Sequence, residues 1–200
     1  TVSLFTYAAA GNSTRPLTGQ KPAPTPASAA FRVIELPSGR TLSAGREDLL
    51  GTPVLPGSII KVATLVAALE SGVIGPDTRM LCPREVVIDG QRVPCSHPDL
   101  RRPIGPAEAL AHSCNGYFAA VAGRLRREAL DRALVQLGLP RTPPSVPLPS
   151  AAVGIDGERI PADRLLSAFV RLTTGTLGFG AETRRAVFDG LRGAAEYGTA

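Results

Sequence analysis

A nearly continuous apolar run follows Ser58 and limits the folds that this chain can adopt. Within residues 59–69 only Lys61 and Thr64 interrupt it, and Gly72 ends it shortly afterwards. A helix that is apolar on nearly every side belongs in the middle of a domain, with other elements packed around it. We therefore expect a central buried helix whose first turn carries a serine and a lysine.

Ser58 and Lys61 fit the spacing S-x-x-K, which has a chemical use on a helix. Positions three apart lie on one face, with β-carbons about 5–6 Å apart, so the lysine amine can reach the serine hydroxyl. A serine is a weak nucleophile until a neighbour takes its proton, and burial favours a neutral lysine that can do so. The Ser58 N–H could also supply one donor of an oxyanion hole. The alternative is an N-capping serine beside a surface lysine, because S-x-x-K alone is a common pattern.

A second polar group stands further along the chain, in the segment Ser113-Cys114-Asn115. A serine near the amine of Lys61 can pass a proton during general acid–base chemistry, and an asparagine can hold both that amine and a substrate amide. The alternative is a helix cap between two helices, a position that serine and asparagine serve equally well.

Together the two motifs and their surroundings resemble the transpeptidase domain of penicillin-binding proteins. Such domains carry S-x-x-K at the start of the active-site helix and an S-x-N loop opposite the nucleophile. The resemblance runs from about residue 31 to residue 200, with its parts in the expected order. The segments that carry it are 56–72, 109–118, 154–157 leading into 161–165, and 190–192 with 197–200.

The resemblance implies a D,D-transpeptidase, a serine acyltransferase that acts on peptidoglycan stem peptides ending in D-alanyl-D-alanine. In such enzymes the serine forms an acyl-enzyme, releases the last D-alanine and passes the acyl group to the amine of a second stem. β-Lactams acylate the same serine. Carried over, Ser58 is the nucleophile, Lys61 the base, Ser113 the proton shuttle and Asn115 the positioning residue. The resemblance implies no metal or organic cofactor, and an extracytoplasmic location in the periplasm or on the outer face of the cell membrane.

The third motif of the family, K-T-G on an edge strand, is absent from this sequence. The nearest segment, Tyr197-Gly198-Thr199, follows Glu196 and lacks the lysine. In the family that strand supplies a charge and a hydroxyl for the substrate carboxylate, together with the second oxyanion donor. We expect the chain to stop shortly before this strand, so that the C-terminal strands of the sheet are missing. The chain is then a fragment, or a partner segment brings the strand.

The resemblance implies an α+β (mixed α/β) fold of the β-lactamase and transpeptidase type, a helical cluster around the buried helix, packed on an antiparallel sheet. Alternating segments around turns predict hairpins over residues 31–44 and 85–93, and repeated prolines predict a loop over 140–149. We expect an extended, Pro-rich N-terminal segment over residues 1–30 and a transpeptidase-like domain over 31–200. Helices are predicted at residues 58–71, 106–110, 115–127, 128–137, 161–172 and 183–195.

The chain has three cysteines and two histidines. Cys82 and Cys95 bracket the second predicted hairpin, and such a pair in an extracytoplasmic protein favours a disulfide, with two free thiols as the alternative. Cys114 is expected to be a small buried hydrophobe. A zinc site could be drawn from these cysteines with His97 and His112. No spacing matches the paired C-x₂₋₄-C or H-x₃₋₅-H knuckles, so we do not expect a metal.

Composition sets limits on the partners of the chain. The net charge is +5, and its arginines are scattered in a way typical of solvated helix faces. Mild attraction to an anionic surface, such as a cell wall or lipid headgroups, is the other interpretation of this charge. No basic stretch interleaved with aromatic residues indicates nucleic acid. No run reaches the ~18 apolar residues that span a membrane, but a start at Thr1 leaves room for a membrane anchor upstream.

Three other functions stay open on the sequence alone. The first is an inactive or sensor-type penicillin-binding module that binds stem peptide or β-lactam without turnover. The second is a β-lactamase, which is less favoured because the segment after Asn115 resembles transpeptidases and no glutamate motif for deacylation is evident. The third is a structural subunit whose missing strand arrives from another chain.

Overall fold

The computed structural model describes residues 6–7, 30–35, 38–174 and 177–199. These residues fall into two compact units, one within Thr1–Val54 and Ile160–Thr176, the other within Leu55–Arg159 and Leu177–Ala200. Most of the Pro-rich segment predicted over residues 1–30 lies outside the described residues. The domain boundaries drawn from the sequence therefore stay a prediction.

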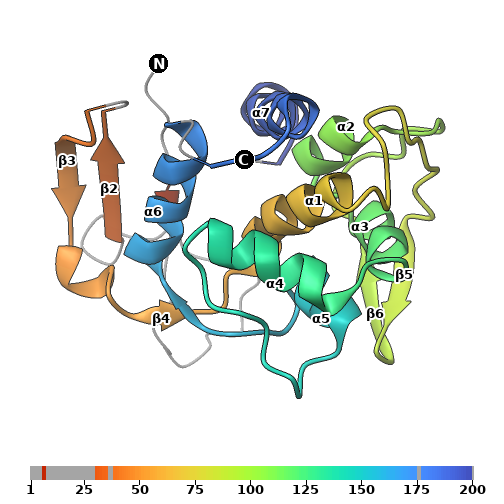
Figure 1. Ribbon diagram of the computed structural model, residues 1–200, viewed down its shortest axis with the longest axis horizontal. Coiled ribbons are helices and arrows are strands. Elements are labelled where there is room, and N and C mark those ends of the chain that lie inside the picture. The colour runs from red at the N-terminus through yellow and green to blue at the C-terminus, as the bar shows by residue number, and fades with distance from the viewer. Residues whose placement is uncertain (1–5, 8–29, 36–37, 175–176, 200) are drawn as a thin grey trace, which may run out of the picture. The chain divides into compact units, whose positions relative to one another are not determined.

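The first unit contains a three-stranded antiparallel sheet in the order β1-β2-β3 (Figure 1). β2 and β3 are the first predicted hairpin, in which the Phe31 ring packs so closely over Gly45 that a β-carbon there would overlap it. Leu165, Ala168 and Leu172 form the buried stripe of the amphipathic helix in this unit. The elements are β1 (Thr6–Tyr7), β2 (Ala30–Ile34), β3 (Thr41–Gly45), η2 (Glu47–Leu49), β4 (Pro53–Val54), β7 (Ile160–Pro161) and α6 (Ala162–Thr173).

The second unit is a cluster of helices around α1, which spans Lys61–Glu70. The eight residues from Lys61 to Ala68 are all buried, and α1 contacts helices α2, α3, α4, α5 and α7 (Figure 1). The central apolar helix predicted from the sequence is therefore confirmed. The other elements are η3 (Gly57–Ile60), β5 (Glu85–Ile88), β6 (Gln91–Pro94), α2 (Pro106–Ala111), α3 (Asn115–Ala122), α4 (Arg127–Gln136), α5 (Leu148–Val153) and α7 (Ala181–Glu196).

The turn that carries Ser58 is a 3₁₀ turn rather than the first turn of an α-helix. Gly57 enters it with a φ of 58°, a left-handed conformation that glycine adopts without strain. Gly154, at the end of α5 with a φ of 85°, lies directly against it, and a β-carbon there would overlap the Gly57 carbonyl oxygen. The Thr64 hydroxyl of α1 donates to the Ala152 carbonyl of α5 over 2.7 Å. Helix α5 therefore braces the Ser58 turn.

Helix α5 was not predicted, because the prolines of residues 140–149 indicated a loop throughout. The structure keeps a loop up to Pro147, but α5 begins at Leu148 and holds Pro149 in its first turn. The first N–H groups of a helix have no partner within it, so a proline is tolerated there. The run of prolines therefore ends where α5 begins.

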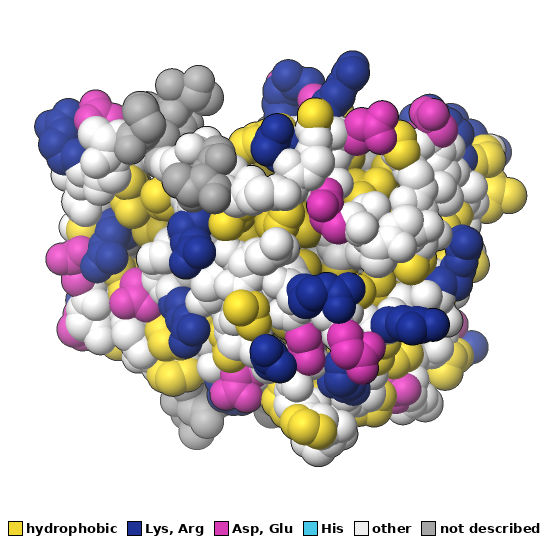
Figure 2. Space-filling model, in the orientation of Figure 1, with side chains coloured by type: hydrophobic (Ala, Val, Ile, Leu, Met, Phe, Trp, Pro, Cys, Tyr) yellow, Lys and Arg dark blue, Asp and Glu magenta, His cyan; other side chains and the backbone are white. Residues whose placement is uncertain are grey.

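On the face shown in Figure 2, Lys and Arg side chains are interspersed with Asp and Glu. In the second unit, Arg102 pairs with Glu108 at 2.5 Å and Arg192 with Asp189 at 2.8 Å. Among the described residues, no helix is both long and apolar enough to cross a membrane.

Candidate active site

The four residues singled out in the sequence meet around the amine of Lys61. Its Nζ atom lies 3.1 Å from Ser58 Oγ, 3.0 Å from Ser113 Oγ and 2.5 Å from Asn115 Oδ1. The Ser113 carbonyl oxygen lies 2.8 Å from the same nitrogen. Ser58 is exposed, Ser113 and Asn115 are half-buried, and Lys61 is fully buried. The site thus places a buried amine beneath a surface hydroxyl.

Ser113 joins α2 to α3 in a left-handed backbone conformation, with a φ of 48°. This conformation costs a residue other than glycine roughly 1–2 kcal/mol. Its result is that both the carbonyl and the hydroxyl of Ser113 reach Lys61. The sequence predicted that the Ser113 hydroxyl lies near Lys61. A serine gives no signal for a left-handed backbone, so the contact of the Ser113 carbonyl with Lys61 was not predicted.

Asn115 links Lys61 to the β5–β6 hairpin. As the first residue of α3, it accepts from Lys61 through Oδ1, while its Nδ2 donates to the Pro94 carbonyl at the end of β6 over 2.7 Å. An acceptor-only carbonyl on one side and an amine on the other fix the orientation of the amide. The contact with Pro94 was not predicted, because a backbone carbonyl leaves no side-chain signal in the sequence.

Burial lowers the pKa of Lys61 from 10.5 to about 8. Loss of hydration inside the helix cluster is the main cause, because it penalises the ammonium form. The nearby sulfurs of Cys114 and Cys95 act in the opposite direction and limit the fall. A lysine with this pKa is partly neutral near physiological pH and can accept a proton there.

The predicted disulfide between Cys82 and Cys95 is wrong for this structure. Both are free thiols with their Sγ atoms 3.4 Å apart, whereas a disulfide bond is about 2.05 Å long. The reason is that the two sulfurs also face His97 and Cys114, and the four ligand atoms lie within 4.8 Å of one another. His112 is not a member of this group.

The sequence comparison identifies the family of the chain. The family described as the penicillin binding protein transpeptidase domain matches residues 19–178. The chain therefore belongs to the penicillin-binding protein transpeptidase family, and its mixed α/β fold is of that type. No curated protein is significantly similar in sequence to the chain.

Solved structures share the fold at low sequence identity. The transpeptidase domain of penicillin-binding protein 3 from Burkholderia pseudomallei has a TM-score of 0.66 and 17% identity, over 82% of this chain and 61% of that one. A peptidoglycan glycosyltransferase from Burkholderia ambifaria has a TM-score of 0.63 and 18% identity, over 79% and 63%. A chain of a peptidoglycan synthase complex has a TM-score of 0.64 and 21% identity, over 76% and 34%. This chain thus spans from about a third to under two thirds of each structure.

Proposed function

We propose that this chain is a D,D-transpeptidase domain that acts on peptidoglycan stem peptides ending in D-alanyl-D-alanine through a Ser58 acyl-enzyme. The observation that carries the proposal is the fully buried Lys61 amine, held within 3.1 Å of the exposed Ser58 hydroxyl. Membership of the family supports the reaction type and implies that β-lactams bind the same site. Peptidoglycan lies outside the cytoplasm, so we place the domain there.

The hydrogen-bond partners of Lys61 suit a general base. A neutral amine has two N–H donors and one lone pair. The Ser113 carbonyl and Asn115 Oδ1 can only accept, so they engage the two donors and leave the lone pair for a hydroxyl. Ser58 Oγ is then free to give its proton to Lys61 as it attacks the peptide carbonyl.

The second half of the acylation step uses Ser113. When the tetrahedral adduct collapses, the bond to the terminal D-alanine breaks and its nitrogen requires a proton. The proton held by Lys61 passes through the Ser113 hydroxyl, 3.0 Å away, to that leaving amine. Attack by the amine of a second stem reverses these transfers and frees Ser58. Asn115 keeps the lysine in place through both steps.

The missing K-T-G motif limits the expected rate. The Ser58 N–H is one oxyanion donor in this proposal, and the family takes the second from the strand that is absent from this sequence. Loss of one such donor typically costs about 10²–10³ in turnover. We therefore expect slow acylation of the chain as it stands.

The acylation rate should rise with pH. Only the neutral form of Lys61 can take the Ser58 proton, and the pKa of Lys61 is lowered to about 8. At pH 7 about a tenth of the lysine is neutral, so the rate should increase about ninefold from pH 6 to 7 and about fivefold from pH 7 to 8, and level off above pH 8. Rates of β-lactam adduct formation between pH 6 and 9, read by intact mass, check this. A pH-independent rate would contradict a base that titrates at Lys61.

Covalent labelling with a fluorescent penicillin tests the proposed function. The chain should gain the mass of one penicillin over hours, and the Ser58→Ala variant should gain none. Continued hydrolysis of a chromogenic β-lactam at many turnovers would instead indicate a β-lactamase. A stable adduct without release of D-alanine from a stem-peptide analogue would favour the sensor-type module.

A further inference from the structure

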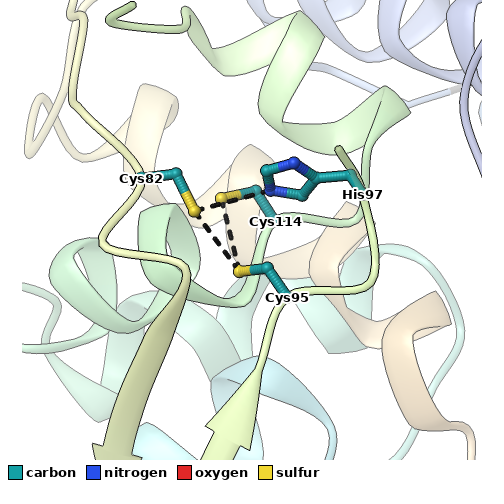
Figure 3. A group of neighbouring side chains, drawn as sticks. All are labelled: Cys82, Cys95, His97 and Cys114. Atoms are coloured by element: carbon teal, nitrogen blue, oxygen red, sulfur yellow. Dashed lines mark hydrogen bonds between the residues drawn. The ribbon is translucent and has the colours of Figure 1, made fainter. Parts of the chain in front are cut away.

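All three cysteines of the chain and one of its two histidines gather in a single cluster. The Sγ atoms of Cys82, Cys95 and Cys114 and a ring nitrogen of His97 point toward one another (Figure 3). They come from three places, namely the loop before β5, the loop after β6 and the residue that caps α3. Cys95, His97 and Cys114 are buried and Cys82 is half-buried. In the part of the chain that the structure describes, this is the one such group.

Three of the distances in this cluster are close to those between ligands of a tetrahedral metal ion, and all four ligand atoms lie within 4.8 Å of one another. Around zinc, with Zn–S bonds of about 2.3 Å and a Zn–N bond of about 2.0 Å, ligand atoms stand about 3.5–3.8 Å apart. Here the Cys82 and Cys95 sulfurs are 3.4 Å apart, those of Cys95 and Cys114 are 3.9 Å apart, and Cys82 Sγ is 3.5 Å from His97 Nε2. A disulfide would join only two of the three sulfurs. The third thiol and the His97 imidazole would then pack against it without a ligand to share.

Each sulfur accepts a hydrogen bond from a backbone amide. The N–H of Arg84 donates to Cys82 over 3.3 Å, that of Gly116 to Cys95 over 3.4 Å, and that of Tyr117 to Cys114 over 3.4 Å. Donors aimed at sulfur stabilise the thiolate, which is the form that binds a metal. Gly116 permits this approach, because a β-carbon on it would meet Pro83 and the Cys82 sulfur.

His97 is held in the tautomer that a metal requires. Its Nδ1 lies 2.7 Å from the Pro98 carbonyl oxygen, which can only accept, and 3.2 Å from Arg84 Nη1, which can only donate. The Nη1 group also donates to the His97 and Pro98 carbonyls, so the shorter contact with Pro98 favours the proton on Nδ1. Nε2 then presents its lone pair toward the sulfur of Cys82. The Arg84 guanidinium donates to the carbonyls of His97, Pro98 and Cys95 and fixes the same loop. A backbone partner on the second ring nitrogen is the usual support of a metal-bound histidine.

We propose that Cys82, Cys95, His97 and Cys114 bind one structural zinc ion. Three thiolates and one imidazole in tetrahedral array suit zinc better than harder cations, which prefer oxygen. Binding displaces the three thiol protons to solvent and leaves a site of net charge −1, with the cationic Arg84 beside it. No metal was expected here from the sequence, because the ligands come from separate loops and not from paired knuckles.

The ion joins the β5–β6 hairpin to the residue between Ser113 and Asn115. Cys114 thereby holds the strained turn that presents both of these residues to Lys61. This positioning effect rests on the proposed function, whereas metal binding itself does not. Zinc content can therefore be measured without any acylation assay, so the two proposals can fail separately.

Metal analysis of the reduced, purified 200-residue chain tests the site directly. We expect about one bound zinc per chain, and with cobalt the intense visible bands of tetrahedral cobalt thiolate. His97→Ala should bind zinc at least about a hundredfold more weakly, because even loss of an outer partner costs 10–100-fold. The neighbouring His112→Ala is the matched control and should keep its zinc, since His112 is not part of the cluster although its ring is 5.4 Å from that of His97.

Chelation of the unmodified chain gives a second measurement that does not depend on the folding of a variant. Removal of zinc should lower the thermal midpoint, and zinc but not magnesium should restore it. A chain with free thiols that binds cobalt without thiolate bands, or equal zinc in His97→Ala, would overturn the proposal. So would an intact mass lower by two hydrogens in the chain as first purified, which indicates a disulfide.

Discussion

Replacement of Lys61 by alanine is expected to lower the rate of Ser58 acylation by about a thousandfold, the middle of the range for loss of a general base. The reason is that Lys61 is fully buried and Ser58 Oγ lies 3.1 Å from its amine. Without the amine, the Ser58 proton loses the base that the structure places beside it. A time course of β-lactam adduct formation by intact mass measures the effect.

The Lys61→Arg variant distinguishes a role of Lys61 as a base from a role as a fixed positive charge. Arginine keeps the charge but does not release its proton at accessible pH, so this variant should be nearly as slow as Lys61→Ala. Thermal midpoints of both variants show whether the helix cluster is intact. A Lys61→Arg variant that acylates at close to the original rate would contradict the role of Lys61 as base.

Replacement of Gly154 by alanine is expected to destabilise the folded chain by about 3 kcal/mol. Its φ of 85° costs alanine about 1–2 kcal/mol. The added methyl group would also overlap the Gly57 carbonyl and press on Ile60, and such overpacking typically costs 1–3 kcal/mol. The thermal midpoint should fall by roughly 6–12 °C. Because Gly57 precedes Ser58, acylation should slow as well.

Gly178→Ala is the matched control for this prediction. No described atom lies within 4 Å of where its β-carbon would stand, so the change in stability should stay within about 0.5 kcal/mol. Equal midpoints for the two variants would mean that Gly154 does not brace the Ser58 turn.

Most of the helices could be predicted because their signals are local. The apolar run after Ser58 required a buried helix, and α1 is buried from Lys61 to Ala68. Pro106 marked the start of α2. Helix α5 was missed because the prolines that open it are also loop formers. The pairing of β4 with β7 was missed because two-residue strands carry no pattern of their own.

The candidate site was predictable in its residues but not in its geometry. Ser58 and Lys61 are three residues apart, so their contact could be predicted from the geometry of one helical turn. The placement of Ser113 and Asn115 beside Lys61 came from the family resemblance, since contacts between distant segments depend on the whole fold. A contact between distant segments also forms the cluster of Cys82, Cys95, His97 and Cys114. No familiar sequence spacing indicated this cluster.

If Ser58 is the acylated nucleophile, peptide mass spectrometry should locate a penicillin adduct on this residue. The chain is incubated with a penicillin and digested, and the modified peptide is sequenced by fragmentation. We predict a single adduct on Ser58, absent from Ser58→Ala and strongly reduced in Lys61→Ala. An adduct on another residue, or equal labelling of Ser58→Ala, would contradict the account, as would a folded chain that takes up no penicillin at all.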